Sequence, residues 1–239
     1  MNKTALLAAT AVLALTAGGA SAGAPHPTAL ATGVKSHPIH LPPTGVLYSQ
    51  NSNGSGSAVV SQNFTSGFFS TYDAALADDF VVPAGHTWSV SEVDVTGEYF
   101  NGPGPATSEV VTFYKNKTKK GVSHPGKVVD AYTLTCTDSD GSFACVLPTK
   151  GKKGKPATKL KAGTYWLSVV ANLAYLNQNE TIVNGEWGWE STTNAIQGSE
   201  SQWQNPGGGF GVGCTSWTDT STCIGSVAAD LMFDLQGTG

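Results

Sequence analysis

Short runs in which apolar and polar residues alternate, separated by turn-forming residues, fill the chain from position 46 to the C-terminus. Successive side chains of a strand point to opposite faces, so this period predicts strands with one buried face, and no window keeps a helical period. The run 87–100 places its apolar residues at Trp88, Val90, Val93 and Val95. The alternation slips once, between Val90 and Val93, and this indicates a β-bulge.

Glycine, proline, asparagine and aspartate bound these runs, and no helical segment alternates with them. The pattern predicts an all-β chain, an antiparallel two-sheet β-sandwich or jelly roll of about nine or ten strands. The expected strands fall within residues 46–50, 58–62, 77–83, 87–100, 108–116, 127–136, 143–149, 163–172, 186–191 and 228–237.

The N-terminal residues predict export. Lys3 precedes an apolar run over 5–17, and the sequence Ala-Ser-Ala at 20–22 has the small-x-small pattern of a signal-peptide cleavage site. The apolar run is shorter than the roughly 20 residues of a membrane-spanning helix. We therefore expect a signal peptide at 1–22, a flexible proline-rich leader at 23–45 and a single β-sandwich domain at 46–239. The mature protein is expected to be secreted or periplasmic and to carry no transmembrane anchor.

The cysteines form two close pairs in the sequence, Cys136 with Cys145 and Cys214 with Cys223. An exported chain meets an oxidising compartment, so disulfides are expected. Three connectivities exist, and the two local pairings require the least loop closure. Each closes a loop of about ten residues, worth roughly 2.5–3 kcal/mol by chain entropy. A zinc site is the other interpretation, and this spacing without a nearby histidine fits zinc poorly.

Charge excludes one class of partner. All 13 basic residues are lysine, and the net charge is −4. The negative net charge gives the chain no overall attraction to nucleic acid. Without arginine, it also lacks the side chain that forms paired hydrogen bonds with guanine or phosphate. We therefore expect no nucleic-acid binding. Most of the lysines lie in two predicted loops, 115–121 and 150–161. These loops either form a patch for an anionic polysaccharide or cell-wall polymer, or are solvated hairpin loops.

The stretch EWGWES, 186–191, combines aromatic and acidic side chains. On a strand, Trp187 and Trp189 share one face, and Glu186 and Glu190 share the other. The tryptophans are either a platform on which sugar rings stack or the core face of a sandwich strand. The two glutamates stand about 13 Å apart along a strand at roughly 3.3 Å per residue, too far to form a glycosidase carboxyl pair by themselves.

A glycine-rich segment follows, WQNPGGGFGVGCTSWTDTSTC at 203–223. It contains Trp203, Phe210 and Trp217 and the second cysteine pair, which should tie the segment down. Long ordered loops often carry function, so two interpretations are open. The segment is either part of a binding site or an Ω-like loop that caps one end of the sandwich.

Acidic clusters at two turns suggest a structural calcium site, because Ca²⁺ is bound by carboxylate and carbonyl oxygens. The candidate ligands are Asp73, Asp78 and Asp79 in the first turn and Asp138 and Asp140 in the second. An Asp-Gly turn inside a disulfide-closed hairpin explains the second cluster without a metal. No other cofactor is expected.

The segments ADDFVVPAGHTWSVSEVDVTGEYFNG, GTYWLSVVAN, EWGWES, WQNPGGGFGVGC and ADLMFDLQG occur in this order. Together they resemble exported bacterial β-sandwich proteins without an established function, over most of the chain from Val46 to Leu235. The resemblance implies export and a β-sandwich, and it implies no catalytic residues.

A second similarity is to the glutamic peptidases, which are also exported β-sandwiches and use a Gln–Glu pair. It would assign the glutamate to Glu186 or Glu190 and the glutamine to Gln202 or Gln204. The flanking motifs of that family do not match here.

The sequence thus predicts a secreted, non-catalytic binding or surface-associated module with polysaccharide as its ligand class. The expected stacking residues are Trp187, Trp189, Trp203 and Trp217, with Glu190 and Gln202 as hydrogen-bonding partners. One alternative is a hydrolase with a carboxylate-based site that uses Glu186, Glu190 or Gln202. The other is a purely structural envelope or matrix protein.

Overall fold

The computed structural model describes residues 26–35, 37–38, 45–148, 158–176, 183–194, 196–225, 227 and 229–239. The predicted signal peptide at 1–22, and part of the predicted leader, lie outside these residues. The strands are β1 Leu30–Thr32, β2 Val46–Ser49, β3 Gly54–Val60, β4 Gln62–Phe64, β5 Ala75–Val95, β6 Gly97–Phe100, β7 Ser108–Lys119, β8 Val122–Leu134, β9 Thr137–Ser139, β10 Ser142–Val146, β11 Lys159–Leu173, β12 Glu186–Thr192, β13 Gln202–Gln204, β14 Thr218–Asp219, β15 Asp230–Leu231 and β16 Phe233–Thr238. A 3₁₀ helix, η1 Gly67–Tyr72, and a short α-helix, α1 Thr220–Ile224, complete the elements of this part of the chain.

The fold is an all-β sandwich of two sheets, as expected. The larger sheet has the path β14-β13-β5-β11-β7-β8, with β2, β4, β9, β10 and β16 attached, and the smaller sheet has the path β1-β3-β12-β15, with β6 attached. The pairings are antiparallel except that of β4 with β11, which is parallel. More strands form than the nine or ten expected, because several are only two to four residues long.

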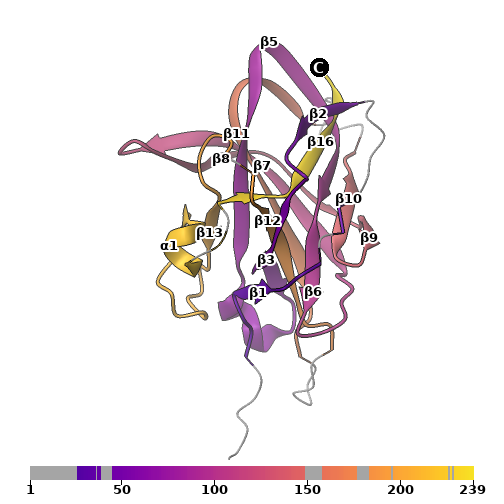
Figure 1. The fold of residues 1–239 in the computed structure, drawn as a ribbon, viewed down its shortest axis with the longest axis vertical. Coiled ribbons are helices and arrows are strands. Elements are labelled where there is room, and N and C mark those ends of the chain that lie inside the picture. The colour runs from indigo at the N-terminus through magenta and orange to yellow at the C-terminus, as the bar shows by residue number, and fades with distance from the viewer. Residues whose placement is uncertain are drawn as a thin grey trace, which may run out of the picture.

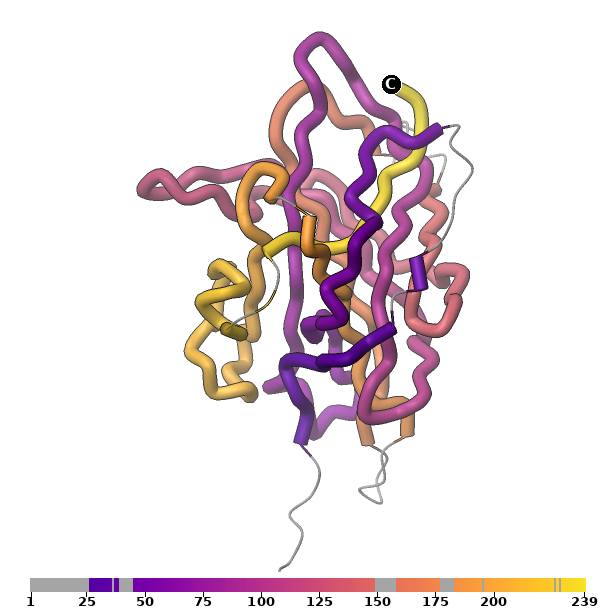
Figure 2. The backbone as a smooth tube through the Cα atoms, in the orientation of Figure 1, coloured from indigo at the N-terminus to yellow at the C-terminus, as the bar shows by residue number. Residues whose placement is uncertain are grey.

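Strand β5 is the longest element and bends over at one end of the molecule. Figure 1 shows it rising along the sandwich, turning at the upper end and running back down. Its first half pairs with β13 and its second half with β10 and β16, while β11 pairs with both halves. Figure 2 shows that the C-terminus lies at this same upper end, where β16 pairs with the start of β2.

The predicted bulge in β5 is confirmed. Glu92 pairs with Gln236 and Val90 with Gly237, so Ser91 is an extra residue without an opposite partner. The bulge turns both Val90 and Val93 toward the core, where they are 2 % and 0 % exposed. An extra residue reverses the side-chain alternation once, and this explains the slip seen in the sequence.

Both predicted disulfides are present, Cys136–Cys145 and Cys214–Cys223, each joining residues nine positions apart. The first closes the β9–β10 hairpin. The turn residues of this hairpin, Asp140 and Gly141, have φ angles of 54° and 91°. Positive φ at both central residues is the requirement of a type I′ hairpin turn, which favours the sequence Asp-Gly.

The leader prediction is wrong for residues 26–35. Leu30–Thr32 forms β1, which pairs with Ser57–Val59 of β3, and the backbone N–H of Val60 donates to the carbonyl of Ala29 at 3.0 Å. The segment has no alternating apolar pattern in the sequence, and backbone pairing with the edge of the sheet holds it in place.

The three tryptophans Trp187, Trp189 and Trp203 are all 0 % exposed. Trp187 stacks on Phe143 with 4.8 Å between ring centroids, and its Nε1 donates to the carbonyl of Gly141 at 2.7 Å. Such burial combines a large apolar surface with a satisfied indole N–H. These side chains therefore form the core of the sandwich.

We expect Trp187→Ala to lower the free energy of unfolding by about 3–5 kcal/mol, because it removes a fully buried aromatic side chain. The partly exposed Trp217 is the matched control, and Trp217→Ala should cost about 1 kcal/mol or less. Urea unfolding followed by circular dichroism measures both losses. Equal losses in the two variants would contradict this description of the core.

Candidate functional site

A groove with a volume of about 710 Å³ runs between the outer end of the β7–β8 hairpin and the segment around β14. We call the hairpin end, residues 115–127, the arm. The arm extends sideways from the sandwich, on the side where α1 lies (Figure 1). The groove is lined by Lys117, Lys119, Val122, His124, Pro125, Gly126, Lys127, Gln202, Ser216, Trp217, Thr218 and Asp219.

The arm is a hairpin whose sequence dictates its turn and its bend. Lys120 and Gly121 join β7 to β8 with φ angles of 52° and 85°, as in a type I′ turn. Register shifts on both sides of Tyr114 mark bulges, which bend a hairpin and change its direction. The Nε1 of the buried Trp166 donates to Oδ1 of Asn116 at 2.9 Å and ties the arm to β11.

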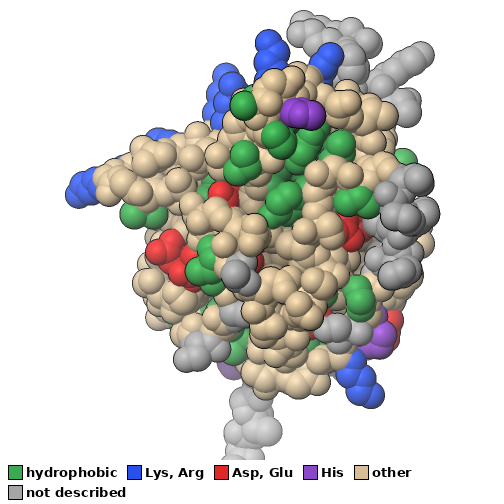
Figure 3. All heavy atoms as spheres, turned by 45° about the horizontal axis from the view of Figure 1, so that its top comes forward, with side chains coloured by type: hydrophobic (Ala, Val, Ile, Leu, Met, Phe, Trp, Pro, Cys, Tyr) green, Lys and Arg blue, Asp and Glu red, His purple; other side chains and the backbone are tan. Residues whose placement is uncertain are grey.

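The structure corrects the prediction that the lysine-rich segment 115–121 is a loop. Residues up to Lys119 belong to β7 and pair with β8. Figure 3 shows lysine side chains at the tip of the arm and at the neighbouring upper end of the molecule. The second lysine-rich segment, 150–161, lies mostly outside the described residues.

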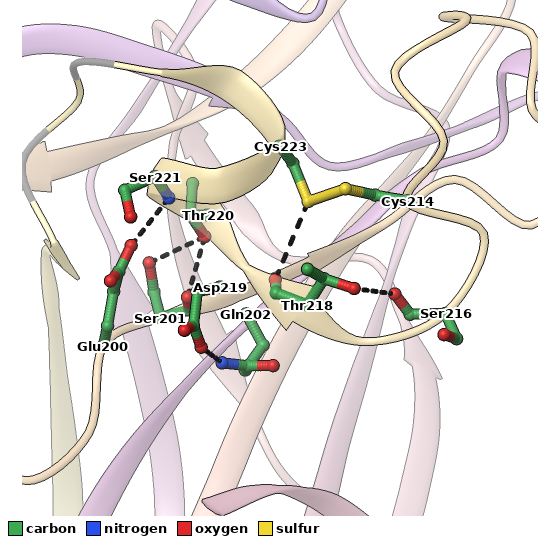
Figure 4. The surroundings of a disulfide bond; sticks show 10 residues. All are labelled: Glu200, Ser201, Gln202, Cys214, Ser216, Thr218, Asp219, Thr220, Ser221 and Cys223. Carbon is green, nitrogen blue, oxygen red and sulfur yellow. Dashed lines mark hydrogen bonds between the residues drawn. A yellow bond between two sulfur atoms is a disulfide. The ribbon is translucent and has the colours of Figure 1, made fainter. Parts of the chain in front are cut away.

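The opposite wall of the groove consists of β13, β14 and the residues before β14. Gln202 pairs with Asp219 across these two strands, and its Nε2 donates to Oδ1 of Asp219. The hydroxyl of Ser201 donates to that of Thr220 at 2.9 Å, and the Cys214–Cys223 disulfide closes the segment (Figure 4). The disulfide and these bonds fix the backbone that carries Trp217.

The electrostatics of the groove are asymmetric. The arm contributes Lys117, Lys119 and Lys127, and the opposite wall contributes one carboxylate, Asp219, which already accepts a bond from Gln202. Trp217 is partly exposed and meets Tyr114 edge to face at 6.0 Å between centroids. The groove thus offers an aromatic ring held at a fixed angle beside an excess of positive charge.

The glycines of the 203–223 segment do not line this groove, although residues 216–219 of the same segment do. Asn205, which is 1 % exposed, donates from Nδ2 to the carbonyls of Thr71 and Asp73 at 2.8 Å each. Gly207 packs so closely that a Cβ there would lie 2.6 Å from Cα of Thr71. Residues 205–209 thus pack on η1 as a capping loop, while residues 216–219 form one wall of the groove, so each interpretation fits a different part of the segment.

The structure corrects the predicted stacking platform. Trp187, Trp189 and Trp203 lie in the core with their indole N–H groups bonded to the carbonyls of Gly141, Met232 and Val60. Of the predicted stacking residues, Trp217 alone lines the groove. Of the predicted hydrogen-bonding partners, Gln202 lines it and Glu190 does not.

As predicted, the tryptophans and the glutamates of β12 lie on opposite faces of the strand. The face with the glutamates is buried, as is the face with the tryptophans. Glu186 is 0 % exposed and accepts bonds from the backbone N–H of Thr28 and from Nδ2 of Asn101, each at 2.7 Å. Burial raises the pKa of Glu186 to about 7. Glu190, 1 % exposed, accepts from the N–H of Gly56 at 3.3 Å. Both glutamates are buried within the fold, and this placement does not support them as a hydrolytic site.

Two of the predicted calcium ligands, Asp73 and Asp138, accept hydrogen bonds that hold the fold. Asp73 accepts from the N–H of Phe64 at 2.7 Å, and Asp138 accepts from the N–H of Gly141 and the hydroxyl of Tyr99 at 2.8 Å each. Asp140 is exposed in its turn, and among the described residues none of the five predicted ligands belongs to a group of three potential ligand atoms within 4.8 Å. Asp78 and Asp79 are buried and are considered below.

Among the described residues, one group of three potential ligand atoms lies within 4.8 Å, formed by Glu109, Cys136 and Cys145. Because both cysteines are in a disulfide, they are not thiolate ligands.

Sequence reasoning missed the lysines of the arm as individual site residues. A signal was present, because Lys115, Lys117 and Lys119 recur at every second position and so share one face of a strand. The opposite wall had no such signal, since its position beside the arm depends on tertiary structure.

Comparison of the chain with protein-family models, curated proteins and solved structures found no match. The resemblance to exported bacterial β-sandwich proteins therefore stays a prediction. No helix in the described part of the chain is long and apolar enough to cross a membrane. The two disulfides are compatible with an extracellular or periplasmic location.

The buried Glu186 gives the fold a pH dependence with a definite sign. Its pKa rises from 4.5 in the unfolded chain to about 7 in the fold. Between these values the folded chain holds a proton that the unfolded chain has released. The stabilisation that the protonated Glu186 gives to the fold is therefore fully present below pH 4.5. As the pH rises to about 7, the free energy of unfolding falls by as much as about 3 kcal/mol because this stabilisation is lost.

We expect Glu186→Gln to flatten the fall in unfolding free energy over this pH range, measured by urea unfolding at several pH values. The partly exposed Glu98 is the matched control, and Glu98→Gln should keep the wild-type slope. If the unfolding free energy of Glu186→Gln depends on pH as strongly as that of the wild type, the Glu186 carboxyl does not cause the pH dependence.

Proposed function

We propose that this protein is an exported, non-catalytic binding protein whose groove beside the arm binds an anionic polysaccharide. Export is supported by the signal-peptide pattern of residues 1–22 and by the two disulfides. The observation that carries the ligand class is the combination of Trp217 with Lys117, Lys119 and Lys127 in one groove.

Each part of the groove suits one part of such a ligand. The partly exposed ring of Trp217 offers an apolar face for the C–H face of a sugar, while its edge contact with Tyr114 holds it in place. Lys117 and Lys119 stand about 7 Å apart on one strand face, which suits carboxylate, sulfate or phosphate groups on successive units. A lysine ammonium group is a compact charge on a flexible side chain, so it can bind such anionic groups without a fixed bidentate geometry.

Polar groups complete the site. Gln202 donates one amide N–H to Asp219, and its carboxamide and the hydroxyls of Ser216 and Thr218 border the groove. Ligand sites combine apolar surface with a few placed polar groups that fix orientation. The groove is open at the surface and carries an excess of lysine, so a charged chain fits it better than a small apolar molecule.

The test is calorimetric titration of residues 23–239 with polygalacturonate and with a neutral glucan. We expect saturable binding of the anionic polymer alone, weakening as salt rises because exposed charges are screened. Trp217→Ala should weaken binding by about 30-fold, the loss typical of an aromatic hot spot. The double variant Lys117→Ala, Lys119→Ala should weaken binding and reduce its salt dependence.

Lys161→Ala is the matched control, because Lys161 is exposed on β11 and does not line the groove. It should bind as the wild type does. Binding that survives Trp217→Ala, or equal binding of the neutral glucan, would contradict the proposal.

A further inference from the structure

A second pocket, separate from the groove, lies where the end of β2, the end of β12 and the start of β15 meet. Its volume is about 410 Å³, and every residue that lines it is polar. The hydroxyls of Ser49, Ser52 and Thr192, the carboxamide of Asn194 and the carboxylate of Asp230 face it. A pocket whose lining residues are all polar favours a polar or charged occupant over an apolar one.

Asp230 has an oxygen without a partner. The residue is 1 % exposed, its Oδ2 accepts from the N–H of Gln197 at 2.7 Å, and its Oδ1 is buried with no hydrogen-bond partner. Leaving a buried carboxylate oxygen unsatisfied is costly, so such an atom calls for a donor or a cation.

Two further carboxyl groups lie behind Asp230. Asp78 is 0 % exposed, and its Oδ2 accepts from Nε2 of Gln50 and from the N–H of Leu231, each at 2.7 Å. Asp79 is 2 % exposed and accepts from the N–H of Ser199 at 2.8 Å. Burial, and then the charge of Asp230, raise the pKa of Asp78. The three side chains are thus close enough to repel one another.

No described lysine lines this pocket. No lysine or arginine occurs in 36–114 or 162–239, the two stretches from which all the walls of the pocket come. Among the described residues, lysine occurs in the N-terminal segment, in the arm and in β11. Within this part of the chain no cationic side chain balances these carboxylates, and a cation from the solvent would do so.

We propose that this pocket binds a calcium ion, with the carboxylate of Asp230 as its charged ligand. Ca²⁺ accepts six to eight oxygen ligands in flexible geometry, including amide oxygens and waters, and the neutral oxygens of this pocket suit it better than the small Mg²⁺. Asp78 and Asp79 contribute through their charge, since they do not converge with Asp230 within direct ligand distance. With one direct carboxylate, the Kd is expected in the range of roughly 10⁻⁴–10⁻³ M typical of extracellular modules.

The first experiment uses residues 23–239 freed of metal by a chelator and titrated with CaCl₂. At a calcium concentration about 100 times the Kd, the melting temperature should rise by roughly 5–10 °C. Asp230→Asn keeps the shape of the side chain and the acceptor for Gln197, and it should weaken calcium binding at least tenfold. The exposed Asp140 is the matched control, and Asp140→Asn should bind calcium as the wild type does.

Terbium luminescence gives a readout that does not depend on stability. Tyr48 donates its hydroxyl to Oε1 of Gln50 at 2.6 Å, and Gln50 lines the pocket, so a Tb³⁺ ion bound there lies near an aromatic donor. We expect sensitised emission that calcium displaces and that Asp230→Asn abolishes. Asp79→Asn removes a neighbouring charge but no direct ligand, and it should weaken calcium binding severalfold. This variant replaces Asp230→Asn in the test if Asp230→Asn does not fold.

The inference is overturned if the wild type binds neither calcium nor terbium up to about 10 mM, well above the expected Kd. It is also overturned if Asp230→Asn binds as tightly as the wild type, or if Asp140→Asn alone loses binding. The groove variant Trp217→Ala should keep calcium binding, so this inference and the proposed function fail or hold independently.

Discussion

Both walls of the groove depend on the pairing of one strand, β5. Its first half pairs with β13 on one side, which carries β14 and Trp217, and with β11 on the other side, which carries β7 and β8. Backbone ladders fix strand spacing and register far more rigidly than side-chain contacts between loops would. The lysines of the arm and the aromatic ring opposite them therefore keep a constant separation because each is attached through hydrogen-bonded strands to the same 21-residue element.

Local sequence predicted much of this fold. Alternation identified the β class, the slip between Val90 and Val93 identified the bulge, and loop closure identified both disulfides. The two faces of β12 were also assigned correctly. What alternation could not show is that both faces would be covered, one by the opposite sheet and the other by the N-terminal segment around Thr28. The sequence therefore left Trp187 and Trp189 open as either a platform or a core face, and the structure places both in the core.

The candidate sites were harder to predict because they join distant parts of the chain. Trp217 and Lys119 are almost 100 positions apart, and Asp230 lies about 150 positions from Asp78. A single sequence contains no signal for such proximity. Charge segregation was visible, however, since most of the lysines lie between 115 and 161 while residues 162–239 have none. The fold turns this separation into two surfaces of different character, a lysine-lined groove and a polar pocket that holds the carboxylate of Asp230.

The most direct test of the groove as the functional surface is nuclear magnetic resonance. Backbone amide signals of residues 23–239 would be followed during titration with a short oligogalacturonate. The account predicts that shifts concentrate in the arm, residues 115–127, in residues 216–219 and in the indole signal of Trp217, with β12 and the pocket at Asp230 unaffected. Shifts confined to the upper end of the sandwich, or spread evenly over exposed lysines such as Lys35 and Lys161, would contradict it.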